Sequence, residues 1–402
     1  MVNDAHGGPF MQALGYSTNL HAAEGSDEIA QALADFAAPA RERLGWDQLG
    51  VDLRLGAQAI GDLADPAARD RLRRVLDEHR LSAHTLNGFP LGRFQAEVVK
   101  RDAYRPDWCD DERLAASEAL LDLALALSDA PLVTISTVPG SYRPFGAARN
   151  DAAAIAARLG RWAAAAARRQ RDTGRTAVLC PEPEPWCFLE NSWDVAWFWQ
   201  GPLAEHGLAA CAEALDGDLA AARIALATHL GVCLDTCHVS LAFEDQAAAV
   251  ARMRAAGARI AKCQVSAAPE VAHPHADADG LAELRALAEP RFLHQTAART
   301  AAGSIARVED LDQLDACLAR LPDASAVRSH FHIPLFREPV ERGLSSTVHD
   351  SVAGLRAAIA AGCTHVAVET YTWSVLEKRA RDAFEGTVRE LAFLRGVVDG
   401  LR

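Results

Sequence analysis

Eight short apolar runs, separated by longer segments of helical period, restrict the fold of this chain more than any other feature. The runs cover residues 14–20, 49–55, 81–88, 130–137, 176–182, 230–236, 260–266 and 364–370. The segments between them carry an apolar stripe and a charged face, as in residues 27–44, 66–80, 152–172 and 352–362. This alternation predicts a parallel sheet with helical crossovers, and eight such units close most economically into a (β/α)8 TIM barrel.

An open doubly wound sheet is the main alternative fold. Such a sheet usually carries a G-x-G-x-x-G loop after its first strand, and the stretch YSTNLHAAEG at residues 16–25 does not match that pattern. The length of 402 residues also lies within the range of barrels with insertions. We therefore predict a single barrel domain over residues 1–402.

Nearly a hundred residues between the seventh and eighth predicted strands exceed what a bare barrel needs. They include a His/Asp-rich loop at 271–280, a helical segment at 308–321 and a strand-like run at 327–336. We predict that residues 268–328 form an insertion over the barrel mouth. His273 and His275, in its first loop, are interpreted as solvated loop residues. Residues 1–12 are expected to be a flexible N-terminus.

The composition argues against some classes of partner. The formal net charge of −13 repels phosphate backbones, and no Lys/Arg block with interleaved aromatic residues offsets it, so we expect no nucleic-acid partner. The N-terminal stretch lacks the pattern of a signal peptide, and acidic residues break the most apolar helical stretch, so we expect no membrane span. Nine cysteines, several within strand-like runs, are typical of reduced buried thiols and predict a cytoplasmic protein.

The sixth run, GVCLDTCH, places Asp235 and His238 at a strand end. Side chains alternate along a strand, and the side that faces the helices should be apolar, so Asp235 is predicted to point into the barrel mouth. The same count directs three further oxygen-bearing side chains inward, those of Glu182, Gln264 and Glu369.

Several carboxylates in one low-dielectric mouth repel each other unless they are protonated, paired or bridged by a cation. The sequence therefore predicts a divalent metal held by Glu182, Asp235, Gln264 and Glu369. Oxygen ligands favour Mn²⁺ or Mg²⁺, while nearby histidines also admit Zn²⁺, Co²⁺ or Fe²⁺.

Two further residues near this predicted site admit more than one role. Lys262 shares the inward parity of Gln264. It is a candidate catalytic residue that compensates carboxylate charge or holds a substrate anion, or it packs low in the barrel against an acid. Glu184, in the rigid stretch PEPEP, is expected to face solvent or to support Glu182 from behind.

The stretch DTCH closely resembles the signature of endonuclease IV, a member of the xylose-isomerase-like TIM barrel superfamily. The resemblance implies that Glu182, Asp235 and Glu369 are metal positions. Gln264 stands where the superfamily normally has histidine. Asn87 and Ser136 stand where the nuclease has two histidines, which together with the net charge argues against DNA repair.

The stretch HFHIPLF resembles the D-x-H pair with which the nuclease binds a further metal. The resemblance implies a second metal held by His238, His330 and His332. The interpretation that we favour from the sequence is instead that these histidines donate hydrogen bonds to a substrate.

Nearly the whole chain resembles a narrower group, the metabolite traffic protein EboE family. The resemblance is carried by stretches such as GYSTNLH, LNGFPLGRF, STVPGSYRP, PEPEP, GVCLDTCH, LHQ, HFHIPLF and VETYTW. It implies a sugar phosphate isomerase/epimerase-like protein in a bacterial pathway that makes or moves an unidentified metabolite.

In epimerases of this superfamily a metal binds adjacent carbonyl and hydroxyl oxygens, and two carboxylates exchange the proton between them. The resemblance implies Glu182 and Glu369 as catalytic residues, and His238 and, from its inward parity, Lys262 are further catalytic candidates. The expected ligand is a polyol, a sugar or a phosphorylated metabolite. A metal-dependent phosphoesterase or nuclease-like hydrolase and a non-catalytic metabolite-binding barrel remain as alternatives.

Polar and aromatic residues in the predicted loops at the mouth are candidates for substrate contacts, because Trp and Arg can stack on and clamp a polyol or a phosphate. The candidates are Asn19, His21, Asn87, Arg93, Tyr142, Arg143, Trp186, His294 and Trp373.

Overall fold

The computed structural model describes residues 13–336, 343–373 and 383–401. The predicted flexible N-terminus, residues 1–12, lies outside the described residues. Within the described part, no helix is both long and apolar enough to cross a membrane.

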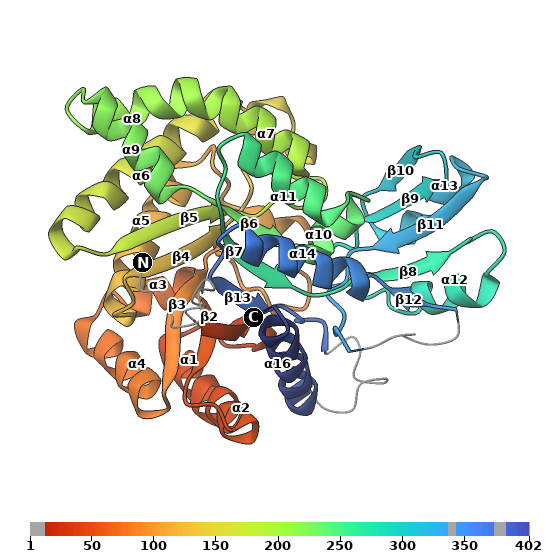
Figure 1. Ribbon diagram of the computed structural model, residues 1–402, viewed down its shortest axis with the longest axis horizontal. Coiled ribbons are helices and arrows are strands. Elements are labelled where there is room, and N and C mark those ends of the chain that lie inside the picture. The colour runs from red at the N-terminus through yellow and green to blue at the C-terminus, as the bar shows by residue number, and fades with distance from the viewer. Residues whose placement is uncertain (1–12, 337–342, 374–382, 402) are drawn as a thin grey trace.

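Eight parallel strands form the barrel, in the order β5-β4-β3-β2-β1-β13-β7-β6 (Figure 1). Each predicted strand is confirmed, and so is the TIM barrel. The strands are β1 (Ala13–Ser17), β2 (Leu49–Arg54), β3 (Leu81–Asn87), β4 (Leu132–Thr137), β5 (Thr176–Pro181), β6 (Val232–Asp235), β7 (Ile260–Val265) and β13 (His365–Val368). A parallel bridge between Leu179 and Leu230 joins the two end strands, β5 and β6, so the sheet is nearly closed.

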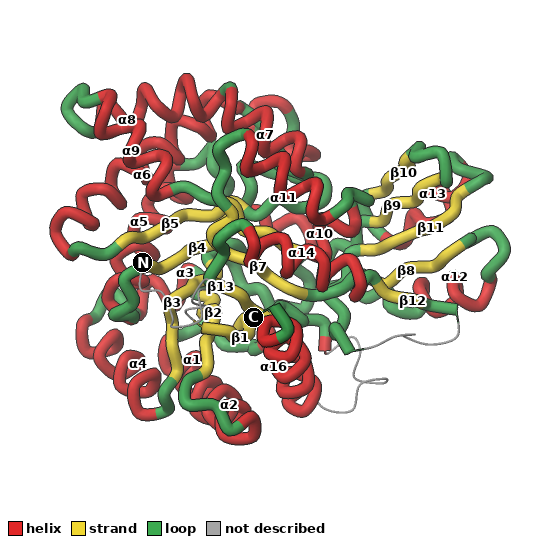
Figure 2. The backbone as a smooth tube through the Cα atoms, viewed as in Figure 1, coloured by secondary structure: helices red, strands yellow, loops and turns green. Residues whose placement is uncertain are grey.

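Helices surround this sheet (Figure 2). They are α1 (Ser26–Ala32), α2 (Ala38–Leu44), α3 (Ala57–Asp62), α4 (Pro66–Glu78), α5 (Asp111–Leu127), α6 (Ala152–Thr173), α7 (Ser192–Gln200), α8 (Leu208–Ala214), α9 (Leu219–His229), α10 (Thr236–Leu241), α11 (Gln246–Ala255), α14 (Val348–Ala360) and α16 (Ala383–Asp399). Helix α6 shows why these segments are helical. Asp151 caps its first turn, Gly174 ends it with a left-handed φ of 70°, and Ile155, Leu159 and Trp162 lie on its buried face.

The long connection between β7 and β13 folds into an antiparallel sheet beside the barrel, on the right in Figure 1. Its order is β10-β9-β11-β8-β12, and α12 (Ala278–Arg285) and α13 (Leu314–Ala319) accompany it. The strands are β8 (Pro269–Ala272), β9 (Thr296–Thr300), β10 (Ile305–Val308), β11 (Ala324–Ser329) and β12 (Ser345–Ser346). This sheet runs beyond residue 328, and the predicted limits of the insertion, 268–328, stay a prediction.

The connection between β3 and α5, residues 88–110, reaches the mouth of the barrel and is held at its base by one buried arginine. Arg113 donates hydrogen bonds to the carbonyl oxygens of Gly88 (2.8 Å), Phe89 (3.1 Å) and Pro106 (2.7 Å). The guanidinium therefore ties both ends of the loop to α5. Further along the loop, Gln95 contacts the backbone of Asn19 (2.7 Å).

Replacing Arg113 with leucine is expected to leave three buried carbonyl groups without donors. Since each such group costs about 1–3 kcal/mol, the free energy of unfolding should fall by about 3 kcal/mol or more. Urea denaturation followed by circular dichroism measures this change. Arg71→Leu is the control, because the contact of Arg71 with the described residues is an exposed ion pair at 3.6 Å. An equal effect of the two substitutions would contradict the role assigned to Arg113.

Candidate metal site at the barrel mouth

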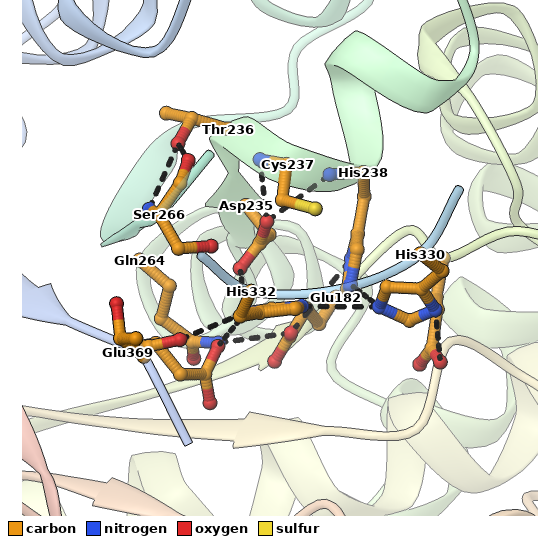
Figure 3. Close-up of polar contacts among 12 residues, drawn as sticks. Glu182, Asp235, Thr236, Cys237, His238, Gln264, Ser266, His330, His332 and Glu369 are labelled. Carbon is orange, nitrogen blue, oxygen red and sulfur yellow. Dashed lines mark hydrogen bonds and ion pairs between the residues drawn. The ribbon is translucent and has the colours of Figure 1, made fainter. Parts of the chain in front are cut away.

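The four side chains predicted to converge do meet at the carboxyl ends of their strands (Figure 3). Asp235 ends β6, Gln264 lies in β7, and Glu182 and Glu369 directly follow β5 and β13. All four are buried. Carboxylate oxygens of Glu182, Asp235 and Glu369 lie within 4.8 Å of one another. The parity argument thus placed these residues, and their role as metal ligands stays a prediction.

Asp235 is fixed by the start of a helix. Its Oδ1 accepts hydrogen bonds from the backbone N–H groups of Cys237 (2.7 Å) and His238 (3.1 Å), which makes it the N-cap of α10. Its Oδ2 is buried and has no hydrogen-bond partner among the described residues. The strand-to-helix turn in DTCH therefore aims one carboxylate oxygen into the site.

The two glutamates are held by amide side chains. Oε1 of Glu369 accepts hydrogen bonds from Asn19 (2.8 Å) and Asn87 (3.1 Å), and its Oε2 contacts the Gln264 amide. Oε1 of Glu182 accepts a hydrogen bond from the same amide at 2.9 Å. Its Oε2 is buried and, among the residues described, lacks a hydrogen-bond partner.

The acidity of the three carboxyl groups reflects this crowding. Burial, together with the negative charge of Asp235, raises the pKa of Glu182 well above its usual range. Burial and the charges of Glu182 and Asp235 do the same to the pKa of Glu369. Burial also opposes the ionisation of Asp235, but the neighbouring His238 and His332 and a backbone hydrogen bond keep its pKa below the usual value.

These features fit a divalent cation. Within the described part of the chain, two buried oxygens, Oε2 of Glu182 and Oδ2 of Asp235, lack hydrogen-bond donors. Three carboxyl groups cannot all ionise so close together without a compensating positive charge. A metal ion would satisfy both requirements at once.

The Gln264 side chain turns its nitrogen, and not its oxygen, toward the two glutamates. Its Nε2 donates to both glutamates, while its Oε1 accepts from the Cys233 thiol at 3.1 Å. In this arrangement the amide bridges Glu182 and Glu369 and turns its oxygen away from them. Its predicted role as a fourth ligand stays a prediction.

Three histidines form a second polar cluster beside the carboxylates (Figure 3). Nε2 of His330 lies 3.0 Å from Nε2 of His238 and 3.0 Å from Nε2 of His332. Each Nδ1 faces an acceptor, namely the Pro183 carbonyl (2.9 Å), the Gln295 side-chain oxygen (2.7 Å) and the Glu369 carbonyl (2.9 Å) for His238, His330 and His332 respectively.

The tautomers of these histidines follow from their acceptors. A carbonyl oxygen can only accept, so each Nδ1 carries the proton, and a neutral ring then presents a lone pair at Nε2. Burial and the neighbouring histidines hold the pKa of His330 well below its usual value, and burial lowers the pKa of His332 to about 4, so extra protons are disfavoured. Three lone pairs that face one another are compatible with a bound metal ion, and the second metal implied by the resemblance stays a prediction.

Glu184 lies beside the site, so of the two expectations for it the solvent-facing one is wrong. It is buried, it accepts a hydrogen bond from the Tyr104 hydroxyl at 2.7 Å, and one of its oxygens lies within 4.8 Å of nitrogens of His238 and His330. Burial raises the pKa of Glu184 to about 7. The signal was present in PEPEP, because residues 182 and 184 share one parity.

Sequence reasoning missed Gln295 and Tyr104 as supporting residues. Gln295, directly before β9, donates to the Tyr104 hydroxyl at 2.8 Å and accepts from His330. Neither residue lies in a metal-ligand pattern, although Gln295 belongs to the stretch LHQ that carries part of the family resemblance.

A cavity of about 50 Å³ lies over the site. Asn19 and Asn87 line it, as predicted, and so do the following residues: Glu182, Glu184, Glu369, His238, His330, His332, Phe89, Pro90, Phe94, Ala103 and Tyr371. This volume holds a few water molecules, since one needs about 10–15 Å³ of such space.

Several predicted substrate-contacting residues do not line this cavity. His21 contacts the Tyr16 hydroxyl and packs on Phe36, and Arg93 is exposed. His294 stacks on Phe331, and Trp373 packs against Gly386 inside the protein. The remaining three, Tyr142, Arg143 and Trp186, lie in a different region. Their positions depend on loop paths that sequence periodicity does not define.

Lys262 lies deeper in the barrel. Its ammonium group donates to Asp52 Oδ1 (2.8 Å), Ser136 Oγ (2.9 Å) and the Leu86 carbonyl (3.3 Å), and it does not line the cavity. These contacts favour the packed lysine–acid pair over the predicted catalytic role.

The chain is similar to several solved structures at low sequence identity. An L-ribulose 3-epimerase structure has a TM-score of 0.48 and 13% identity over 97% of this chain and 95% of that one. The structure of a D-psicose 3-epimerase in the presence of D-fructose has a TM-score of 0.48 and 15% identity over 96% of this chain and 99% of that one. The structure of the probable 3-DHS dehydratase AsbF from Bacillus anthracis has a TM-score of 0.42 and 10% identity over 96% of this chain and 99% of that one.

No family model and no curated protein matches the chain. Membership of the EboE group therefore stays a prediction. A structure described as a xylose isomerase-like TIM barrel fusion protein matches 98% of this chain and 43% of its own length, with a TM-score of 0.44 and 14% identity. The function proposed below rests on the side chains of this chain.

Replacing Lys262 with methionine should leave Asp52 charged and buried without its partner. The free energy of unfolding is expected to fall by about 3–5 kcal/mol. The double variant Lys262→Met/Asp52→Asn should recover most of this loss, because it removes both charges, and bound metal should remain. Denaturant titration and metal analysis of the purified variants measure both effects. A stable Lys262→Met protein that loses metal would instead place Lys262 in the site.

Proposed function

We propose that this chain is a metal-dependent isomerase or epimerase that acts on a sugar, a cyclitol or a sugar phosphate by proton transfer between carboxylates. The observation that carries the proposal is the pair of buried glutamates, Glu182 and Glu369, which one amide bridges at the wall of a small cavity. Oε2 of Glu182 has no hydrogen-bond partner in the described part of the chain.

Glu182, Asp235 and Glu369 would hold the metal, with Mn²⁺ or Mg²⁺ favoured by the oxygen ligands and Zn²⁺, Co²⁺ or Fe²⁺ admitted by the neighbouring histidines. When bound, such an ion polarises a carbonyl or hydroxyl oxygen and so acidifies the adjacent C–H or O–H bond.

The two glutamates are the proposed acid and base. They follow strands β5 and β13, which are separated by β6 and β7 on one side of the barrel, so they can approach a substrate from different directions. Asn19 and Asn87 hold Glu369 Oε1 by hydrogen bonds, and this orients the carboxyl group for removing a proton at carbon. Glu184 is proposed to hold a substrate hydroxyl.

His238, His330 and His332 would hold the second metal through their Nε2 atoms. Their Nδ1 contacts fix all three rings in the tautomer that a metal ligand requires. If these histidines hold substrate hydroxyl groups instead, their Nε2 lone pairs would accept hydrogen bonds from those hydroxyl groups. The sequence led us to expect the opposite, that the histidines donate hydrogen bonds to the substrate.

The substrate must gain access to a cavity that is smaller than a sugar. Phe94 lines it and packs on Phe292 and Tyr371, with ring centroids 4.8 and 5.1 Å away. We propose that the tip of the 88–110 loop moves when a six-carbon ligand binds, whereas its base remains anchored by Arg113.

Two other functions each have one supporting observation. The three-histidine cluster beside the carboxylates favours a hydrolase of phosphate esters that uses two metals. The Gln264 amide, which occupies the space between two proposed ligands, favours a barrel that binds a metabolite without converting it.

The proposed pathway is bacterial metabolite synthesis or transport, as the EboE resemblance implies. A cytoplasmic location is the corresponding proposal, and it is supported by nine cysteines that are all free thiols.

The metal content of the purified protein is expected to fall in Glu182→Gln and Asp235→Asn, because each removes one anionic oxygen from the ligand set. Inductively coupled plasma mass spectrometry of the full chain measures the loss. His330→Ala should remove only a second ion, and Glu283→Gln serves as a control outside the site. Unchanged metal content in both carboxylate variants would refute the first site.

Solvent deuterium should enter the carbon next to the carbonyl of a ketose or oxidised cyclitol substrate when the wild-type chain is incubated in D₂O with Mn²⁺. Glu182→Gln and Glu369→Gln should each slow this exchange by about a hundredfold or more, since they remove a proton acceptor. NMR and mass spectrometry follow the exchange. Absence of exchange across ketoses and keto-cyclitols with metal bound would refute proton transfer and leave hydrolysis or binding.

A further inference from the structure

A second and larger cavity lies outside the proposed metal site. It has a volume of about 470 Å³ and is lined by Arg143, Pro144, Trp186, Glu190, Arg307 and Glu309. These residues come from the connections after β4 and β5 and from the region of β10 in the insertion sheet. Sites for small molecules usually measure about 300–1,000 Å³, so this outer cleft is large enough for a sugar whereas the inner cavity is not.

Trp186 reaches the outer cleft from a strained turn. The Cys187 N–H donates to the Glu184 carbonyl at 3.0 Å, which closes a four-residue turn with Pro185 in second position and Trp186 in third. Trp186 has a φ of 65°, a left-handed value that the third position of a type II turn requires and that glycine or asparagine normally supplies.

The left-handed backbone of Trp186 is unfavourable for folding, so we expect the side chain to have a function that a glycine could not supply. A bulky residue in the left-handed region costs about 1–2 kcal/mol, and a glycine would make the same turn without this cost. Trp186 is only partly buried, and its side chain lines both the outer cleft and a small cavity beneath it. Strained residues of this kind cluster at ligand sites.

The charges of the outer cleft are already paired. Arg307 contacts Glu190 at 2.9 Å, Arg143 contacts Asp194 at 2.6 Å, and Glu309 accepts hydrogen bonds from Arg101 (2.6 Å) and the Tyr142 hydroxyl (2.9 Å). A phosphate would have to compete with these carboxylates for the guanidinium groups. Hydroxyl groups both donate and accept, so they can bind to the arginines and the carboxylates together.

A wall separates the outer cleft from the metal site. The rings of Tyr104 and Tyr142 stack with centroids 4.3 Å apart, and the hydrogen bonds from Gln295 to Tyr104 and from Tyr104 to Glu184 continue this wall. A ligand in the outer cleft therefore need not touch the proposed metal ligands.

We propose that the outer cleft is a second ligand site that binds a neutral polyhydroxylated ring, a pyranose or a cyclitol, with the C–H face of the ring on the Trp186 indole and its hydroxyl groups on Arg143, Arg307 and Glu190. This site does not depend on the reaction proposed for the barrel mouth.

Saturation-transfer NMR of the full chain with methyl glucopyranosides, cellobiose and myo-inositol tests the proposal. At least one of these probes should bind to the wild type. Trp186→Gly should weaken that binding by about tenfold or more, because it removes the stacking face. The thermal midpoint of this variant should equal or exceed that of the wild type, because the turn strain is relieved.

Matched variants test whether the probes bind in the outer cleft. Trp193→Ala removes an exposed tryptophan of α7 that does not line the cleft, and it should leave binding unchanged. Glu182→Gln should also leave probe binding in the outer cleft unchanged. A failure of the function proposed for the metal site can therefore be told apart from a failure of the outer-cleft proposal. Arg307→Met, which retains the turn, should weaken binding even if Trp186→Gly does not fold.

Three outcomes would overturn the proposal. They are the absence of binding by every sugar and cyclitol probe, full binding in both Trp186→Gly and Arg307→Met, and preferential binding of inorganic phosphate in a parallel calorimetric titration.

Discussion

The mutual repulsion of three buried carboxyl groups is the constraint on which the mouth of this barrel depends. Glu182, Asp235 and Glu369 meet in a low-dielectric space, and each is supported in a different way. A helix start holds Asp235, and amide groups hold the two glutamates. These neutral donors orient the carboxylates without cancelling their charge, so a demand for positive charge remains. Deeper in the barrel, the ammonium group of Lys262 neutralises the negative charge of Asp52.

The insertion contributes to the site as much as the barrel does. The segment after β11 supplies His330 and His332, and Gln295, beside β9, orients His330. A barrel alone would present the carboxylates and His238. The additional loop after β7 therefore adds a nitrogen-rich cluster to an oxygen-rich one, and both open into the same small cavity. The proposed proton transfer and the proposed second metal both rest on this juxtaposition.

The same elements separate the mouth into two compartments. The Glu184 and Tyr104 side chains belong to the inner cavity wall or its support, whereas Trp186, two residues further along the chain than Glu184, faces the outer cleft. A single turn with a left-handed tryptophan thus lies between the proposed metal site and the wider cleft that we propose for a polyhydroxylated ring.

Sequence periodicity was sufficient for all eight strands and for the inward direction of Glu182, Asp235, Gln264 and Glu369, because strand parity and the carboxyl-end rule are local and topological properties. The same parity applied to Glu184, but the surrounding prolines indicated only a rigid loop and left open whether Glu184 faces solvent or supports Glu182. The path of loops decided the rest. Tyr142, Arg143 and Trp186 follow the expected strands, yet they line or support a separate cleft.

The sequence by itself determined the barrel and the convergence of its carboxylates. Only the tertiary structure decided that Gln264 donates to both glutamates, that Lys262 is used by Asp52, and that three histidine Nε2 atoms face each other. Residue type specifies which groups are available, but hydrogen-bond direction depends on partners that are distant in the chain, and the fold alone brings those partners within reach.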